Sequence, residues 1–138
     1  MDLDGQQLAG TRLRTSEALT HFGIMKRQPA CKSCVHAHPP HALVFAATHR
    51  PIPCVSEAFY YYGVPEIPVC IPALSGTPQL SASVLGTFGT HPSSHSTYAA
   101  VIPDHGVVVA APDLDVAYSI LDGAESMARV ALLRKLLE

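Results

Sequence analysis

The sequence has 138 residues, a net charge of −2, 48% hydrophobic residues and 14% charged residues. This length suits one domain with one core, and the apolar content excludes a disordered chain. The slightly acidic balance argues against a nucleic-acid partner, and the apolar runs are too short to cross a bilayer. No basic segment followed by an apolar one opens the chain, so the predicted location is the cytoplasm.

The predicted elements alternate between helices and short strands. In chain order they are a strand or loop (1–14), a helix (from Thr15 or Ser16 to about Arg27), a strand (31–38), a helix (41–48), a short helix (55–62), a strand (67–71), a helix (78–85), a polar loop (90–97), two strands (98–103 and 106–111) and a C-terminal helix that begins at Asp113 or Asp115. Thr15 or Ser16 is expected to cap the first helix, with Glu17 in its first turn.

The C-terminal helix has the clearest periodicity. Its apolar residues follow a spacing of three and four: Leu114, Ala117, Ile120, Leu121, Ala124, Ala128, Ala131 and Leu132. Short strands alternating with helices indicate an α/β or α+β domain built on one sheet.

His36 and His38 are two residues apart on the predicted strand 31–38. Alternate side chains of a strand point to the same face, so both imidazoles can be directed at one point. Histidine is a common zinc ligand, and His105, just before the apolar run 107–109, is the natural third ligand. The alternatives are two partly exposed strand histidines and a turn histidine without a function.

Glu17 is the candidate catalytic base. A carboxylate beside a metal can move a proton between carbon and oxygen during a reaction. The alternative is a glutamate that only interacts with the helix dipole. Thr15 and Ser16, at the same helix N-terminus, are candidate substrate-binding residues that can donate hydrogen bonds to an anion.

Cys31 and Cys34 offer another interpretation of this region, a structural zinc knuckle or a redox pair. Strand alternation places Cys34 on the face of His36 and His38 but Cys31 on the other. The motif also precedes a strand and not a helix, which is not typical of a redox pair. We therefore expect free thiols without a structural disulfide in a cytoplasmic protein.

Six short motifs occur in a specific order along the chain. They are Asp2-Leu3-Asp4-Gly5, Thr15-Ser16-Glu17, Val35-His36-Ala37-His38, Gly76-Thr77-Pro78-Gln79-Leu80, Asp104-His105-Gly106 and Asp113-Leu114-Asp115-Val116-Ala117-Tyr118. In this order they resemble the class II aldolase and adducin family over nearly the whole chain. The family's catalytic acid/base corresponds to Glu17, and its metal ligands correspond to His36, His38 and His105.

The resemblance implies a three-layer α/β/α sandwich around a mainly antiparallel sheet, and a homotetramer. It implies a single domain over residues 1–138 that lacks the family's usual N-terminal segment and its phosphate-binding loops. Glu57 and Ser75 stand where the sugar-phosphate aldolases have aromatic active-site residues, which favours a carboxylate substrate that is not a sugar.

The function implied by the resemblance is a metal-dependent carbon–carbon lyase, either an aldolase or a decarboxylase. Its small-molecule substrate would be a hydroxy-carbonyl compound or a carboxylate, cleaved through a metal-stabilised enediolate. Zn²⁺ is the expected metal, and Mn²⁺, Fe²⁺ and Co²⁺ are alternatives because imidazoles accept all four. The alternative functions are a sugar-phosphate epimerase and a non-catalytic, adducin-like scaffold or remnant.

Overall fold

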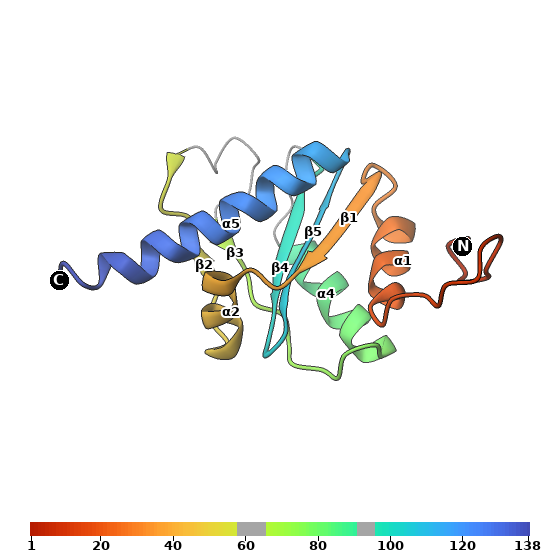
Figure 1. The fold of residues 1–138 in the computed structure, drawn as a ribbon, viewed down its shortest axis with the longest axis horizontal. Coiled ribbons are helices and arrows are strands. Elements are labelled where there is room, and N and C mark those ends of the chain that lie inside the picture. The colour runs from red at the N-terminus through yellow and green to blue at the C-terminus, as the bar shows by residue number, and fades with distance from the viewer. Residues whose placement is uncertain (58–65, 91–95) are drawn as a thin grey trace.

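The computed structural model describes residues 1–57, 66–90 and 96–138, and its elements form three layers (Figure 1). In chain order the elements are α1 (Ala18–Arg27), β1 (Ser33–Ala37), α2 (Pro40–Ala47), β2 (Ile52–Pro53), β3 (Glu66–Ile67), α4 (Pro78–Thr90), β4 (Tyr98–Ile102), β5 (Gly106–Ala111) and α5 (Leu114–Arg134). Helices α1 and α4 pack on one face of the central sheet, and α2 and α5 pack on the other. The predicted α/β/α sandwich is confirmed.

The central sheet has the strand order β1-β5-β4, and both pairs are antiparallel. Strand β5 lies in the middle and is buried along its whole length, which explains its unbroken apolar sequence. Val107 and Val109 pack with α2 and α5, whereas Val108 and Ala110 pack with α1 and α4. Because His36 pairs with Val108, its side chain points toward the α1 layer.

The strand predicted over residues 67–71 is shorter than expected. Only Glu66–Ile67 forms a ladder, and its partner is Ile52–Pro53. Pro68 has no N–H group to extend this ladder. Val69 instead forms an isolated parallel bridge with Val101 of β4. This segment therefore runs along the outer edge of the central sheet.

Three predictions near the middle of the chain have different outcomes. The helix predicted over residues 78–85 is confirmed and continues to Thr90 as α4. Residues 58–62 of the short helix predicted at 55–62, and residues 91–95 of the polar loop predicted at 90–97, lie outside the described residues.

Helix α5 confirms the prediction of a long C-terminal helix. Asp113 is the N-cap, and its carboxylate accepts a hydrogen bond of 2.8 Å from the Val116 N–H group. The buried positions run from Ala117 to Ala131. Leu114, the first residue of the three-four spacing, is 62% exposed, because packing on the sheet begins about one turn later. No helix in the described ranges is both long and apolar enough to span a membrane.

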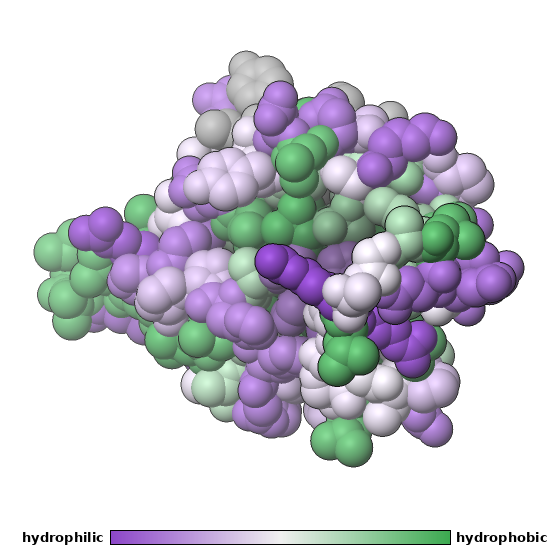
Figure 2. Space-filling model, turned by 45° about the vertical axis from the view of Figure 1, so that its right-hand side comes forward, coloured by the Kyte–Doolittle hydropathy of each residue, from purple (hydrophilic) through white to green (hydrophobic). Residues whose placement is uncertain are grey.

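The two chain ends lie at opposite ends of the molecule (Figure 1). Exposed leucines lie in the last turn of α5, at Leu133, and just after this helix, at Leu136 and Leu137. Figure 2 shows apolar residues at the left-hand end of the molecule, where α5 ends in Figure 1. This end therefore presents apolar side chains to its surroundings.

The N-terminus of α1 corrects the prediction that Thr15 or Ser16 caps this helix. The N-cap position is Glu17, and its side chain makes no capping hydrogen bond. The Thr15 hydroxyl accepts a 3.4 Å hydrogen bond from the Glu17 N–H group, before the helix begins. The Glu17 carboxylate accepts a hydrogen bond from Gly76 in the loop before α4. This tertiary contact takes the place of a capping hydrogen bond from Glu17 to its own helix.

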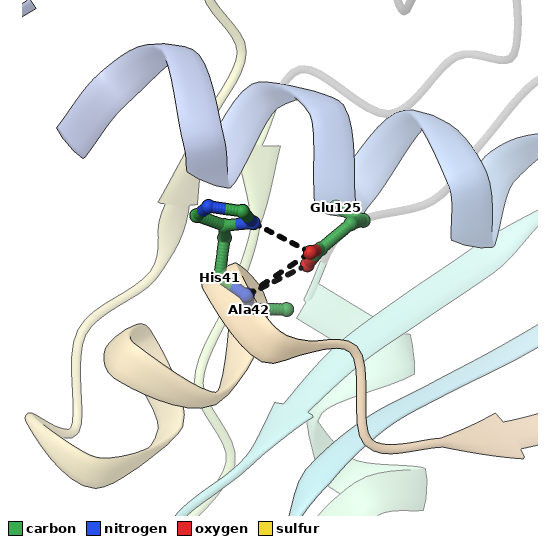
Figure 3. Close-up of polar contacts among 3 residues, drawn as sticks. All are labelled: His41, Ala42 and Glu125. Atoms are coloured by element: carbon green, nitrogen blue, oxygen red, sulfur yellow. Dashed lines mark hydrogen bonds and ion pairs between the residues drawn. The ribbon is translucent and has the colours of Figure 1, made fainter. Parts of the chain in front are cut away.

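Helix α2 is capped by a residue from another helix. Its N-cap, Pro39, makes no side-chain capping bond. The Glu125 carboxylate on α5 accepts hydrogen bonds of 3.0 to 3.1 Å from the N–H groups of His41 and Ala42 (Figure 3). Ring Nδ1 of His41 lies 2.7 Å from the same carboxylate. Glu125 thus fixes the start of the helix that follows His38.

We expect Glu125→Ala to lower the free energy of unfolding by about 1–2 kcal/mol, because α2 loses its cap. Asp122→Ala, an exposed residue one turn earlier on α5, is the matched control. It should change this free energy by less than about 0.5 kcal/mol. Urea denaturation of both variants measures the difference, and equal losses would contradict the capping role.

The same contact makes stability depend on pH. Burial by itself would raise the pKa of Glu125, but hydrogen bonds from Ala42 and His41 outweigh it and lower the pKa below 4.5. The stabilisation is therefore complete above the unfolded-state pKa and is lost as pH falls through the folded-state pKa. Between about pH 5 and pH 3, the wild type should lose more stability than Glu125→Ala.

Candidate metal centre and acid/base site

Three histidines converge at one end of the central sheet. His36 lies on β1, His38 directly follows this strand, and His105 lies in the turn between β4 and β5. Nε2 of His36 is 3.3 Å from Nε2 of His105, and the potential ligand atoms of all three residues lie within 4.8 Å of one another. The ring centroids are 4.7 to 5.1 Å apart. The fold thus brings together the three residues that the sequence predicts as ligands.

This donor set fits a zinc-type cation. Metal–nitrogen bonds of about 2.1 Å in tetrahedral geometry place donor atoms about 3.4 Å apart. The distance between Nε2 of His36 and Nε2 of His105 is 3.3 Å. Three protein ligands leave one coordination position open, which is typical of catalytic and not structural zinc sites.

A backbone contact sets the orientation of the His36 ring. Nδ1 lies 3.0 Å from the carbonyl oxygen of Val107, so Nδ1–H donates and Nε2 keeps its lone pair. Burial lowers the pKa of His36 and outweighs the opposite effect of the Val107 carbonyl. The ring is therefore neutral near pH 7, which is the form that binds a metal.

The turn that carries His105 is anchored to α2. The His105 N–H group donates to the carbonyl oxygen of Ile102 at 3.2 Å, and Asp104 has a positive φ of 55°. The Asp104 carboxylate lies 2.8 Å from Nε2 of His49. The backbone N–H group of Asp104 donates a hydrogen bond to the Ala46 carbonyl oxygen at 3.1 Å. These contacts fix the position from which the His105 ring approaches His36.

Gly106 allows β1 to approach this turn closely. A Cβ atom at Gly106 would lie 2.4 Å from the carbonyl oxygen of Ala37 and 2.8 Å from Cδ2 of His38. Both distances are far inside van der Waals contact, and the backbone oxygen cannot move without a shift of β1. A residue without a side chain is therefore required for His38 and His105 to share one centre.

We expect Gly106→Ala to lower the free energy of unfolding by about 1–3 kcal/mol through overpacking. Zinc affinity should also fall, because β1 is pushed away from the turn. Gly86→Ala in α4 is the matched control, since a Cβ there meets nothing within 4 Å. It should be neutral or stabilising by up to about 1 kcal/mol. Urea denaturation and zinc titration test both, and wild-type behaviour of Gly106→Ala would contradict the prediction.

Glu17 is buried close to this centre, with 2% of its surface exposed. Its Oε1 atom accepts hydrogen bonds from the Ser75 hydroxyl and, at 3.1 Å, from the Gly76 N–H group. The Thr20 hydroxyl donates to Oε2 at 3.4 Å. A buried carboxylate with three donors keeps one orientation, which a group that exchanges protons with a substrate needs.

A cleft of about 540 Å³ adjoins both parts of the site. Its walls come from the loop before α4 and the turn between β4 and β5: Pro72, Ala73, Leu74, Ser75, Pro103, Asp104 and His105. Ser75 bonds to Glu17, and His105 meets the other two histidines. A small molecule in this cleft would therefore contact His105 and Ser75, the hydrogen-bond partner of the candidate base.

Thr15 and Ser16, the predicted substrate-binding residues, are exposed at the start of α1. Neither is among the residues that line the cleft. The backbone oxygen of Ser16 would lie 3.3 Å from a Cβ at Gly76, so Ser16 packs against the loop that holds Glu17. A role of these two residues in substrate binding stays a prediction.

The cysteines do not join the histidine group. The four cysteines are free thiols, and Cys31 is buried, with Sγ donating to the carbonyl oxygen of Ser96. Burial raises the pKa of Cys34 to about 12, and the nearby Cys31 adds to this effect. Within the described residues, the group of potential ligands contains histidines alone, which does not support a zinc knuckle.

Two important contacts were not found by the sequence reasoning. In the sequence, Gly76 stands out only as part of a family motif, and Ser75 only as a departure from the family pattern. Both residues bind the Glu17 carboxylate, and Ser75 is 58 positions away from it in the chain. Gly106, directly after His105, is a usable sequence signal for this geometry. A glycine within a strand often marks a place where another backbone or a ligand approaches closely.

The chain is similar to several known proteins in sequence and in fold. Residues 1–132 match the family described as Class II Aldolase and Adducin N-terminal domain. The chain is 22% identical over 137 residues to a 5-deoxy-D-ribulose 1-phosphate aldolase of Bacillus thuringiensis serovar kurstaki. It is 28% identical over 126 residues to a 5-methylthioribulose-1-phosphate/5-deoxyribulose-1-phosphate aldolase of Rhodospirillum rubrum.

The matches cover more of this chain than of its relatives. The two alignments cover 94% and 86% of this chain, but 58% and 51% of the two aldolases. The solved structure of an L-fuculose 1-phosphate aldolase superposes with a TM-score of 0.87 at 25% identity. That superposition covers 99% of this chain and 61% of the other. The chain thus spans about half to three-fifths of the length of these relatives.

Proposed function

Since this chain belongs to the class II aldolase and adducin family, we propose that it is a metal-dependent carbon–carbon lyase of the aldolase type. The observation that carries the proposal is the convergence of three imidazoles, together with a cleft lined by His105 and by Ser75, the partner of the buried Glu17 carboxylate. His36, His38 and His105 would hold the cation, and Glu17 would be the acid/base.

The proposed cation is Zn²⁺, and Mn²⁺, Fe²⁺ and Co²⁺ are alternatives that imidazole ligands also accept. When bound, such a cation supplies Lewis-acid polarisation of a substrate carbonyl oxygen. The chain's own contribution at this point is the neutral, oriented ring of His36, held by the Val107 carbonyl. The cleft lined by His105 would give a substrate oxygen access to the site.

Glu17 would move the proton. In cleavage of a β-hydroxy ketone, its carboxylate takes the proton of the hydroxyl group as the carbon–carbon bond breaks. The electron pair of that bond stays on the carbon next to the carbonyl, and Glu17 then returns the proton to this carbon. An aldehyde and a smaller ketone result, so atoms and electrons balance. Burial of Glu17 excludes bulk water from both transfers.

The names of the relatives suggest the substrate class that we propose for this chain. The curated relatives and the solved structure are aldolases of ketose 1-phosphates. A ketose 1-phosphate is a β-hydroxy ketone and suits the mechanism above. It is therefore the first substrate class to test, ahead of the carboxylates that the sequence favoured.

The test is a turnover screen of protein loaded with Zn²⁺, Mn²⁺ or Co²⁺. The substrates are L-fuculose 1-phosphate, 5-deoxyribulose 1-phosphate and a β-keto acid. The expected result is release of an aldehyde, which stops when a chelator is added. Release of CO₂ would identify a decarboxylase, and inversion of a stereocentre would identify an epimerase. No turnover together with no stoichiometric metal would refute the proposal and favour a non-catalytic scaffold.

We propose a homotetramer as the working assembly. The apolar end of α5, with Leu133, Leu136 and Leu137 exposed at 48%, 79% and 90%, supports association. Light scattering gives the mass in solution, and a monomer at micromolar concentration would contradict this assembly. A cytoplasmic location stays a prediction from the sequence.

A further inference from the structure

We propose that His49 is a positioning residue for the metal centre, because its ring fixes the turn that carries His105 against the end of α2. The inference rests on the proposed function in one respect, which is that His105 binds the cation together with His36 and His38. It does not depend on the substrate or on the bond that is cleaved. His49 itself lies outside the three-histidine group.

Helix α2 connects two of the three potential ligands. His38 directly precedes the N-cap of this helix, and His105 lies in the turn that the other end of the helix contacts. At that end, the N–H groups of His49 and Asp104 donate to the same acceptor, the carbonyl oxygen of Ala46, at 3.2 and 3.1 Å. The position of His105 relative to His38 therefore depends on how firmly α2 and the turn are joined.

The His49 ring adds a second point of attachment between α2 and the turn. Its Nε2 atom lies 2.8 Å from Oδ2 of Asp104, and the ring is the donor because an ionised carboxylate can only accept. A single hydrogen bond from the Asp104 N–H group allows the turn to tilt about that bond. A second bond, through the side chain of the same residue, restricts this tilt and defines the orientation of the turn.

The backbone conformation at His49 indicates that this residue is present for its side chain. His49 directly follows Thr48, the C-cap of α2, and has a positive φ of 51°. Glycine is the residue favoured at this position of a helix end, because a Cβ atom disfavours the left-handed conformation. Asp104 also has a positive φ, of 55°. Two residues that both adopt a costly conformation, and whose side chains bind each other, favour a function for their contact.

The exposure of this pair indicates that it acts on orientation and not on stability. The side chains of His49 and Asp104 are 46% and 69% exposed, and exposed pairs of this kind contribute little to the free energy of unfolding. The turn that they fix, however, places Nε2 of His105 at 3.3 Å from Nε2 of His36. A tilt of this turn would move one imidazole relative to the other two. Loss of the contact should therefore affect metal binding more than folding.

The experiment compares His49→Gly with the wild type and uses Zn²⁺ and Co²⁺ as probes. Glycine removes the ring but suits the left-handed backbone, so the midpoint of urea denaturation should stay close to the wild-type value. Zinc affinity in competition titrations should fall about tenfold, the lower end of the range for groups that orient a ligand. The visible absorption spectrum of the Co²⁺ complex should change, because the arrangement of the donor atoms changes. His49→Gln keeps a side-chain N–H donor and should recover most of the lost affinity.

Two further variants test whether the effect passes through the turn. Ser96→Gly also replaces a residue with a positive φ, of 53°, but at the opposite end of β4 from this turn. It is the matched control and should change neither the zinc affinity nor the spectrum. In an Asp104→Gly background, which lacks the acceptor of the ring, His49→Gly should cause no further loss of affinity.

Several outcomes would overturn the positioning role of His49. They are wild-type zinc affinity of His49→Gly, a loss of affinity that His49→Gln does not reverse, and a loss that persists in the Asp104→Gly background. A loss of zinc binding that accompanies an equally large loss of stability would show a merely structural role. A wild type that binds Zn²⁺ but cleaves no substrate would refute the proposed function alone, whereas a wild type that binds no Zn²⁺ would overturn both.

Discussion

Replacement of His105 by alanine is expected to weaken Zn²⁺ binding by more than about 100-fold. Loss of a partner that merely orients a ligand costs about 10- to 100-fold in affinity, so loss of a ligand should cost more. The two remaining imidazoles, His36 and His38, both come from the region of β1 and would hold the cation from one side. Isothermal titration with Zn²⁺ measures the change, and the metal content after dialysis gives an independent value.

His41→Ala is the matched control for this prediction. His41 is also a half-exposed histidine, but its ring contacts Glu125 and does not belong to the three-histidine group. Its zinc affinity should stay within about threefold of the wild type, in line with the small effects of substitutions far from a site. If His105→Ala retained wild-type zinc affinity, the three-histidine centre would be refuted. The fold assignment would not be affected.

Glu17→Gln is expected to retain the metal and to lower turnover by about 10²- to 10⁴-fold, the range typical of a lost general acid/base. The amide has nearly the same shape and can still accept hydrogen bonds from Ser75 and Gly76, so the loop keeps its place. It cannot take up a proton in the physiological pH range. Steady-state kinetics of the zinc-loaded protein should show a fall in kcat and a small change in KM.

Glu138→Gln is the control for this substitution, because Glu138 is exposed and forms an ion pair with Arg134. Its kcat should equal that of the wild type. Full activity of Glu17→Gln would remove Glu17 from the mechanism. Loss of activity together with loss of the metal would instead show that Glu17 supports the metal centre.

Local periodicity in the sequence was enough to predict much of the framework. The apolar run after His105 predicted a strand over residues 106–111, and β5 is this strand, buried along its whole length. The three-four spacing after Asp113 predicted α5 and its cap. Side-chain alternation predicted that His36 and His38 point the same way, and their ring centroids are 4.7 Å apart. These features depend only on residues that are neighbours in the chain.

Tertiary packing decided the features that depend on distant partners. Glu17 was expected in the first turn of a capped helix, but it is the N-cap, and its carboxylate binds a loop 58 residues away. The cap of α2 comes from Glu125, 84 positions along the chain from His41. No local pattern encodes such contacts, because they arise only when layers of the fold pack together and buried polar groups must find partners.

The sequence alone therefore determined the fold class, the long helix, the central strand and the identity of the three histidines. Only the tertiary structure decided that these histidines converge, since the approach of β1 to the turn at His105 requires the missing side chain of Gly106. It also decided the orientation of Glu17. The physical reason is that residue type and spacing specify which groups are available, whereas three-dimensional packing specifies which of them come within contact distance.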